Sequence, residues 1–317
     1  MIKKKKTLLI LGGSGFVGKS ILNSFINNKI IKFNINKIII VSRNPKKLKK
    51  ELAITKEKNI FLKKLDLFKA KNLPSADYII HAAEKTINDV IDKKLFTKYH
   101  KLTKKIIDYY SNFKNIKFLY LSSGAVYGKI SYKKKPKETD KTNYKNLKKL
   151  QREYSKNKIK SEKYLLKKFK KDSFIIARLF SFMGKYTPRN GGYAIGNFLN
   201  SIEKSKNIVV KSSNPNRTYR SYLYSDDLVE CLMQLLACKN LSKNSIYNIG
   251  SDNHITIKNL SGIISKNYNL SVNNVGKFKK SIWDYYVPNI EKYKKNFKNT
   301  KFLNINVSIS KSINRKI

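Results

Sequence analysis

The sequence predicts an α/β protein built on a doubly wound parallel sheet, followed by a smaller C-terminal lobe. Short runs rich in Ile, Leu and Val alternate with longer helical stretches through the first half of the 317-residue chain. Runs that are apolar throughout indicate strands buried on both faces, as in parallel sheets covered by helices. A glycine-rich turn directly follows the first run, which is typical of this fold class. The predicted strands are 7–11, 37–41, 60–66, 78–83, 116–123 and 174–180, with further short strands at 220–224 and 245–250.

The second half of the chain is organised differently. The apolar helix DDLVECLMQLLAC lies between the two late strands, whereas the segment 184–198 is irregular and contains Gly and Pro. From residue 251 onward the pattern weakens, and Lys and Asn become abundant. We therefore expect two domains. Residues 1–180 with 218–250 form the sheet domain, and residues 181–217 with 251–317 form the smaller lobe.

The charge of the chain is extreme, because 69 Lys and Arg residues face 20 Asp and Glu residues and give a net charge of +49. Such a charge suits proteins that bind nucleic acids or anionic membranes. However, Asn and Ile are inflated together with Lys, only seven of the basic residues are Arg, and the Lys residues are spread along the whole chain. This pattern is typical of AT-rich coding bias. We therefore expect no specific nucleic-acid partner and no membrane partner, although the charge favours anionic substrates.

Cysteine use and hydropathy indicate a cytoplasmic protein. Cys231 and Cys238 lie seven residues apart in an apolar helical run, which is too far apart for a disulfide, so a reducing compartment is expected. The apolar run before Gly12 is only five residues long, too short for the core of a signal peptide, and no run of 18 apolar residues occurs elsewhere. Nothing in the sequence indicates a metal site.

The glycine-rich turn predicts a dinucleotide site. The strand 7–11 leads into Gly12, Gly15 and Gly18, spaced G-x-x-G-x-x-G, and an apolar helix follows. Glycine permits the tight turn, the approach of the backbone to a pyrophosphate and the packing of helix on strand, and the helix N-terminus attracts the negative charge. Phe16 and Val17, in the same turn, are expected cofactor contacts.

The cofactor is predicted to be NAD or NADP. The second predicted strand ends in Val-Ser-Arg43-Asn, without the carboxylate that would accept a hydrogen bond from the ribose 2′-hydroxyl of NAD. A guanidinium suits the 2′-phosphate of NADP, so Arg43 favours NADP, unless it is simply a solvated loop residue. His81 has two interpretations, as a cofactor contact or as a core histidine with satisfied hydrogen bonds. Further cofactor contacts are expected from Asp66, Leu67, His81, Ala82 and Ala83.

A Tyr followed four residues later by a Lys is an acid/base pair in one large enzyme class, but here it occurs four times, as often as chance predicts in so Lys-rich a chain. Context distinguishes Tyr154 with Lys158. The strand 116–123 ends in two serines at the carboxyl end of a parallel strand, where such folds bind ligands. Only Tyr154 is followed by the tail Ser161-Glu162, which the other three pairs lack. Those pairs are Tyr110/Lys114, Tyr144/Lys148 and Tyr164/Lys168.

With these motifs in place, the chain resembles the extended short-chain dehydrogenase/reductase family of nucleotide-sugar epimerases, dehydratases and reductases. The family combines the glycine pattern with a Ser or Thr four residues before the Tyr of a V-Y-G motif, here Ser123 before Tyr127, and with the Tyr154–Lys158 pair. The resemblance implies a Rossmann fold and a catalytic set of Ser123, Tyr154 and Lys158. Tyr154 would act as acid and base, with Lys158 lowering its pKa. Lys158 would also anchor the nicotinamide ribose and point inward, with Lys156 and Lys160 facing water.

The resemblance also implies a nucleotide-diphosphate sugar as substrate and a homodimer as the assembly. Arg178, Asn197 and Arg220 fall on family positions expected to bind substrate, and the smaller lobe would be the substrate-binding one. For Arg178 a buried ion pair between the lobes is an equal alternative. Dehydratases carry Asp-Glu where this chain has Gly124-Ala125, which cannot transfer protons. The expected activity is therefore that of a 4-epimerase, 4-ketoreductase or decarboxylase in surface-polysaccharide precursor synthesis.

One departure from the family pattern and two rival functions accompany this expectation. The helix before the serine strand has Tyr99 where the family often has an Asn four residues ahead of a Thr, here Thr103. The charge favours a nucleic-acid-binding protein on the same fold as one rival. The other is a protein that binds the cofactor without turnover. Neither rival requires Ser123, Tyr154 and Lys158 together.

Overall fold

The structure is a computed structural model that describes residues 5–52, 54, 58–86, 92, 94–131, 133–170, 172–190, 192–239, 245–279, 283–298 and 300–313. The chain forms two compact units. The first comprises Met1–Ser123, Glu153–Arg178 and Val229–Tyr247, and the second comprises Gly124–Arg152, Leu179–Leu228 and Asn248–Ile317. The functional assignment of the two predicted domains stays a prediction.

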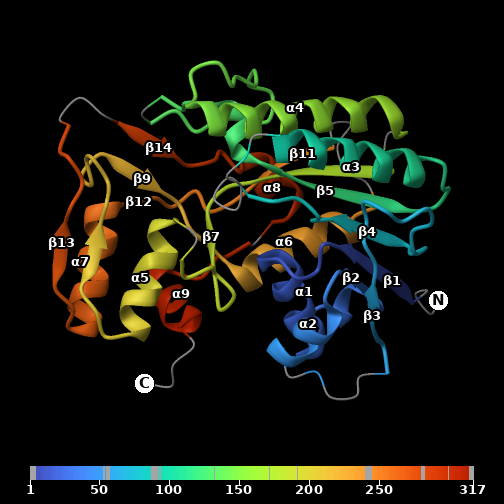
Figure 1. Cartoon of the computed structure of the whole chain (residues 1–317), viewed down its shortest axis with the longest axis horizontal. Helices are drawn as coiled ribbons and strands as arrows, with labels where there is room; N and C mark the ends of the chain where they lie inside the picture. The colour runs from blue at the N-terminus through green and yellow to red at the C-terminus, as the bar shows by residue number, and fades with distance from the viewer. Residues whose placement is uncertain are drawn as a thin grey trace. The chain divides into compact units, whose positions relative to one another are not determined.

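The central sheet confirms the predicted fold class. Its seven strands have the order β11-β6-β5-β4-β1-β2-β3, and the pairs β1–β2, β2–β3, β1–β4 and β4–β5 are parallel (Figure 1). The order of strands reverses at β1, where doubly wound folds bind their ligands. The strands are β1 (Lys6–Leu11), β2 (Ile35–Ser42), β3 (Ile60–Lys64), β4 (Tyr78–His81), β5 (Lys117–Ser123), β6 (Phe174–Leu179) and β11 (Ile246–Ile249).

Helices α3 (Lys94–Ser111) and α4 (Lys149–Lys168) lie side by side along the sheet (Figure 1). Tyr164 of α4 donates a hydrogen bond to Asp108 of α3 at 2.6 Å. Although α4 is rich in Lys, its buried residues recur at helical spacing, and this stripe packs on the sheet while the other positions meet solvent. The stripe comprises Ser155, Lys158, Ile159, Ser161, Glu162 and Leu165.

Three further helices belong wholly or partly to the first unit. They are α1 (Phe16–Ile26), α2 (Pro45–Glu51) and α6 (Ser225–Ala237), and α6 begins in the second unit. Pro45 and the Asn44 side chain begin α2 in the usual manner of a helix N-terminus. Cys231 lies within α6 and Cys238 just after it, and neither is part of a disulfide. Of the helices in the described residues, none is long and apolar enough to cross a membrane.

Within its described residues, the second unit contains three small sheets and its own core. Apolar residues of α5 (Ala194–Glu203) and α7 (Ile257–Tyr268) pack together with β8 (Ile208–Val210). The remaining elements are the 3₁₀ turn η3 (Gly124–Tyr127), β7 (Phe182–Met183), β9 (Thr218–Arg220), β10 (Leu223–Tyr224), β12 (Ile255–Thr256), β13 (Val272–Asn274), β14 (Asp284–Tyr286), α8 (Glu291–Asn296) and α9 (Ile305–Ser312).

The prediction of one strand over 220–224 is wrong. The chain leaves β9 after Arg220, which pairs with Ile255 and Tyr286 of one sheet. It enters β10 at Leu223, which pairs with Phe182 of another. An apolar pattern cannot show such a change of sheet, because the sheet that a short strand joins is set by the distant strands with which it pairs.

Candidate dinucleotide and proton-transfer site

Glycine is required in the loop after β1 because the backbone passes very close to its neighbours. Gly12 has φ of +91°, and a Cβ on it would lie 2.6 Å from the Cα of Ala83. A Cβ on Gly18 would lie 2.5 Å from the Cα of Gly13. The first contact joins the carboxyl ends of β1 and β4, and the second packs α1 on the loop. These are the roles that the fingerprint assigns to its first and last glycines.

Gly15 differs from Gly12 and Gly18 because there is space for a side chain at its Cα. It is the N-cap of α1, and no side chain caps the helix there or adds an acidic group to the first turn. A Cβ on Gly15 would meet nothing closer than the Gly12 carbonyl oxygen, at 3.7 Å. A helix N-terminus with uncapped amides and open space beside it fits a phosphate group. The predicted pyrophosphate position, which Phe16 and Val17 adjoin, therefore suits a dinucleotide.

The residues expected near the adenosine follow β2 and β3. Arg43 is exposed directly after β2, while its neighbour Asn44 is committed to capping α2 through the Lys47 amide, at 3.0 Å. Asp66 lies two residues beyond β3, and its Oδ1 accepts a hydrogen bond from the Phe68 amide at 3.0 Å. Leu67 is buried. Contacts of Arg43, Asp66 and Leu67 with a cofactor stay predictions.

His81 is a core histidine with both ring nitrogens engaged. Its Nδ1 accepts from the Ala83 amide at 3.4 Å, and its Nε2 lies 2.9 Å from the Thr103 hydroxyl. Burial lowers the pKa of His81 to about 4, with Glu84 opposing and Lys158 assisting that shift, so the imidazole is neutral near pH 7. The side chain is thus occupied within the protein, and a role of His81, Ala82 and Ala83 in holding the cofactor stays a prediction.

Lys158 of α4 points inward, as predicted. Its side chain is 6% exposed, and Nζ donates to the Leu121 carbonyl of β5 at 2.7 Å. Ser123 ends the same strand two residues later. The Lys158 Nζ lies 4.8 Å from the ring centre of Tyr120 and 5.9 Å from that of Tyr154. The ammonium therefore sits at the carboxyl end of a central strand, within reach of two phenol rings.

Neighbouring residues hold the pair of Tyr154 and Lys158 in place. The Tyr154 ring meets Phe96 of α3 edge to face, with ring centres 5.6 Å apart. Lys160 is exposed, and Lys156 is 38% exposed beside Glu153. Of the lysines on this part of α4, it is Lys158 that is turned toward the sheet.

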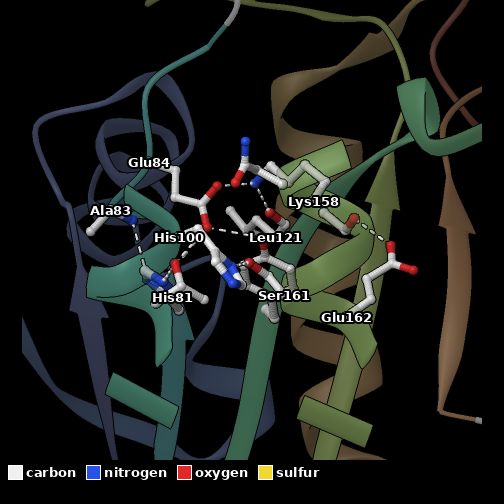
Figure 2. Close-up of polar contacts among 12 residues, drawn as sticks. His81, Ala83, Glu84, His100, Leu121, Lys158, Ser161 and Glu162 are labelled. Carbon is white, nitrogen blue, oxygen red and sulfur yellow. Dashed lines mark hydrogen bonds and ion pairs between the residues drawn. The ribbon is translucent and has the colours of Figure 1, made fainter. Parts of the chain in front are cut away.

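Glu84, which the sequence analysis did not identify, pairs directly with Lys158 (Figure 2). Its Oε2 lies 2.8 Å from the Lys158 Nζ, and its Oε1 accepts from Thr103 and Tyr120 at 2.7 and 2.9 Å. Burial acts to raise the pKa of Glu84, but the charge and hydrogen bond of Lys158 and the Thr103 hydroxyl outweigh it and leave the pKa lowered. The only signal in the sequence was a carboxylate just past the fourth strand, which alone resembles a solvated loop residue.

Arg178 forms a buried ion pair within the first unit. Its Nε and Nη2 donate to the two oxygens of Glu162 at 3.1 and 2.7 Å, and both side chains are 4% exposed. Ser122 donates to the same carboxylate at 2.5 Å. The Glu of the Ser161-Glu162 tail thus joins α4 to β5 and β6. The expected substrate contact of Arg178 stays a prediction.

The other two expected substrate residues belong to the second unit. Asn197 lies in the first turns of α5 and is partly exposed. Arg220 ends β9, where its Nη2 lies 2.5 Å from Oδ2 of Asp284. Each is held on a regular element, but their contact with a substrate stays a prediction.

The fold and the site together define a class of protein: a doubly wound α/β protein with a glycine-rich loop after β1 and a Tyr154–Lys158 pair in which the lysine is buried. Residues 8–250 match the model of the NAD dependent epimerase/dehydratase family. Because this match spans more than half of the chain, the protein belongs to that family. No curated protein has a significantly similar sequence.

Solved structures with low sequence identity share the fold over nearly the whole chain. The UDP-N-acetylglucosamine 4-epimerase from Methanobrevibacter ruminantium M1 is 21% identical, with a TM-score of 0.78 over 98% of this chain and 97% of that one. The UDP-glucuronic acid 4-epimerase from Bacillus cereus, in complex with UDP-glucuronic acid and NAD, is 16% identical, with a TM-score of 0.78 over 96% and 97%. The dTDP-glucose 4,6-dehydratase from Bacillus anthracis, in complex with NAD, is 15% identical, with a TM-score of 0.74 over 96% and 94%.

Proposed function

We propose that the protein is an NAD(P)-dependent nucleotide-sugar 4-epimerase or 4-ketoreductase in which Tyr154 is the acid and base. The observation that carries the proposal is the position of the buried Lys158 ammonium, 5.9 Å from the centre of the Tyr154 ring. The ammonium donates to the carbonyl of Leu121, which lies two residues before Ser123 at the end of β5. Membership of the epimerase/dehydratase family and the open N-terminus of α1 support it.

In this proposal, the side chains of the protein would have the following roles. Tyr154 takes the proton of a sugar hydroxyl or returns it to a ketone, and Ser123 hydrogen-bonds the same oxygen. A phenol ionises near pH 10, so a nearby ammonium is needed to stabilise the phenolate at lower pH, and Lys158 supplies it. A bound nicotinamide dinucleotide supplies the hydride acceptor or donor. Gly12, Gly15 and Gly18 shape the loop that would receive its pyrophosphate.

Two parts of the proposal concern specificity. An exposed Arg43 in place of a carboxylate supports NADP as the cofactor, although NAD is bound in the B. cereus and B. anthracis structures.

Asn197 and Arg220 would bind the nucleotide diphosphate. Residues 181–217 with 251–317 would form the substrate lobe, and the chain would act as a homodimer. Arg178, already paired with Glu162, contributes in this scheme only if it also reaches the substrate.

A 4,6-dehydratase activity is disfavoured by the residues after Ser123. Gly124 and Ala125 stand where that reaction needs two side chains able to transfer protons. A Cβ on Gly124 would lie 2.7 Å from atoms of the Phe180 ring, so the site has no room for a carboxylate unless that ring moves. An epimerase or a reductase needs no group at these positions.

Tyr154→Phe tests the proposal. Purified protein is assayed on UDP-, dTDP-, GDP- and CDP-sugars, and its co-purifying cofactor is identified by mass spectrometry. Loss of the phenol is expected to lower kcat by about 10²- to 10⁴-fold, as for other general acids and bases. Tyr164→Phe on the same helix is the matched control and should keep full activity. Unchanged turnover in Tyr154→Phe would overturn the assignment; tightly held NAD⁺ would identify an epimerase and exchangeable NADPH a reductase.

A further inference from the structure

The Lys158 ammonium does not act alone, because Glu84 binds it directly. One oxygen of the Glu84 carboxylate accepts from the Lys158 ammonium at 2.8 Å (Figure 2). The other accepts from the Thr103 and Tyr120 hydroxyls at 2.7 and 2.9 Å. Its side chain is only 15% exposed. A carboxylate that accepts three hydrogen bonds in such surroundings is held in its ionised form.

The hydrogen bonds that reach Glu84 all point the same way. The Ala83 amide donates to Nδ1 of His81, so the proton of the neutral ring lies on Nε2, which donates to the Thr103 hydroxyl at 2.9 Å. Thr103 then donates its own proton to Glu84. Every donor in the chain is directed at the carboxylate. This series of hydrogen bonds therefore stabilises the negative charge of Glu84 without supplying it a proton.

We propose that Glu84 is a positioning residue of the proton-transfer site: it fixes the Lys158 ammonium and offsets its charge, so that Tyr154 releases its proton at a higher pH than beside an unpaired lysine. The inference rests on the proposed function only in naming Tyr154 as the acid and base. It concerns how this chain sets the working pH of that residue.

The size of the effect follows from simple electrostatics. An unpaired charge close to a titratable group shifts its pKa by about one to three units. Opposite charges 2.8 Å apart act on a more distant group as a dipole, whose field falls off faster than that of one charge. Removing the negative member should therefore lower the pH at which Tyr154 ionises by about one unit.

The other titratable groups around the pair do not obscure this change. His81 has a pKa of about 4, burial lowers the pKa of His100 on α3, and burial with the nearby Glu84 charge raises the pKa of Tyr120 well above 10. Glu162 of α4 is engaged by Arg178 of β6. A change of phenol titration between pH 7 and about 10 therefore reports on Tyr154.

The experiment compares the pH titration of Tyr154 in the wild type and in Glu84→Gln. Phenolate absorbance in the near ultraviolet is recorded against pH, and the curve of the matching Tyr154→Phe protein is subtracted, so that one tyrosine is observed. Gln keeps the size of Glu and can still accept from Thr103, but it carries no charge. The midpoint is expected to fall by about one pH unit. An unchanged or raised midpoint would overturn the inference.

Two further variants sharpen the result. Glu153→Gln removes a carboxylate that directly precedes Tyr154 and lies 4.0 Å from Lys156, and its midpoint should match the wild type. An equal fall in Glu153→Gln would mean that any lost negative charge suffices, and would overturn the role of Glu84. Glu84→Asp withdraws the carboxylate by one methylene and serves if Glu84→Gln does not fold. A smaller fall is expected there, and no fall would overturn the inference.

The titration needs no substrate, so it separates the two hypotheses. If the midpoint falls but no nucleotide sugar is turned over, the inference about Glu84 holds and the proposed function fails. If turnover depends on Tyr154 but the midpoint does not move, the proposed function holds and the inference fails. If both hold, the acidic limb of kcat/KM moves to lower pH by the same amount. Glu84→Gln is then about tenfold more active than the wild type well below the midpoint.

Discussion

At the scale of single residues, burial sets the protonation state of His81 and thereby the direction of the hydrogen bonds to Glu84. An imidazolium at this position would donate from both nitrogens, whereas the Ala83 amide requires an acceptor. The pKa of about 4, caused first by burial, keeps the ring neutral. The hydrogen bonds to Glu84, which pairs with Lys158, thus depend on the neutral form of His81.

The pH dependence of stability tests this state of His81. An unfolded histidine titrates near its ordinary pKa of 6.5, and the folded one near 4. The unfolded chain therefore binds the proton first, and stability is complete above pH 6.5 and lost as pH falls toward 4, by about 3 kcal/mol in all. In His81→Gln, whose amide can donate to Thr103, urea unfolding at a series of pH values should show a shallower loss over this window.

His254 provides a control for this experiment, and Glu84 titrates outside the pH window of His81. His254→Gln alters an exposed histidine whose pKa is also lowered, first by burial, and it should change the wild-type curve less than His81→Gln does. Glu84 has a lowered pKa, so its contribution is present above its ordinary value of 4.5 and is lost only at more acidic pH. Parallel curves for the wild type and His81→Gln between pH 6.5 and 4 would contradict the assignment of a neutral, buried His81.

The residues of the site were predicted unevenly. The sequence predicted Tyr154, Lys158 and Ser123 as site residues, because motif spacing along one helix and one strand is visible in a linear chain. It did not identify Glu84, which lies 74 residues before Lys158 and meets it only after β4 and α4 have packed. It left the partner of Arg178 open for the same reason. Ion-pair partners are chosen by tertiary proximity, and composition does not encode that choice.

At the scale of elements, the glycine loop has two kinds of position that the sequence pattern does not distinguish. Gly12 and Gly18 have backbone atoms where a side chain would stand, whereas the corresponding space at Gly15 is open. The first two are thus required by the fold. Gly15 is required only if a ligand occupies the space at the N-terminus of α1.

Gly15→Ala and Gly18→Ala should therefore separate folding from binding. Gly18→Ala brings a methyl group to 2.5 Å from Gly13 and is expected to lower the free energy of unfolding by about 1–3 kcal/mol. Gly15→Ala should change it by less than about 1 kcal/mol. Its dissociation constant for the dinucleotide, measured by calorimetry, should nevertheless rise by at least about tenfold, a cost near 1.4 kcal/mol.

An unchanged dinucleotide affinity in Gly15→Ala would contradict this prediction. If Gly15→Ala binds the dinucleotide as tightly as the wild type while keeping its stability, the pyrophosphate does not lie at this helix N-terminus. Urea unfolding without cofactor provides the stability measurement for both variants, so each serves as the control for the other.

At the scale of the whole molecule, the net charge of +49 comes mainly from Lys. The scarce Arg residues are placed differently, because three of them form ion pairs within the protein, and Arg178 and Arg189 contact both oxygens of their carboxylates. Arg178 pairs with Glu162, Arg189 with Glu203 and Arg220 with Asp284. This use of Arg supports the interpretation of the Lys excess as compositional.

Binding to double-stranded DNA tests that interpretation. The protein should bind DNA of any sequence weakly at low salt, and the affinity should fall by about 10³-fold or more between roughly 50 and 200 mM salt, as for contacts to phosphates alone. Filter binding with two unrelated sequences measures both points. Preference for one sequence, retained at the higher salt, would instead support the rival function of a nucleic-acid-binding protein.

The sequence by itself determined the parallel sheet, the glycine loop and the Tyr154–Lys158 helix, because hydrophobic periodicity, glycine spacing and short motifs are local properties of the chain. It did not determine the change of sheet between Arg220 and Leu223 or the partner of the Lys158 ammonium. Only the tertiary structure decided these, since strand pairing and buried ion pairs depend on which distant segments meet. The proposed acid/base pair of Tyr154 and Lys158 was thus predicted from the sequence, whereas Glu84, which pairs with the Lys158 ammonium, was found only in the fold.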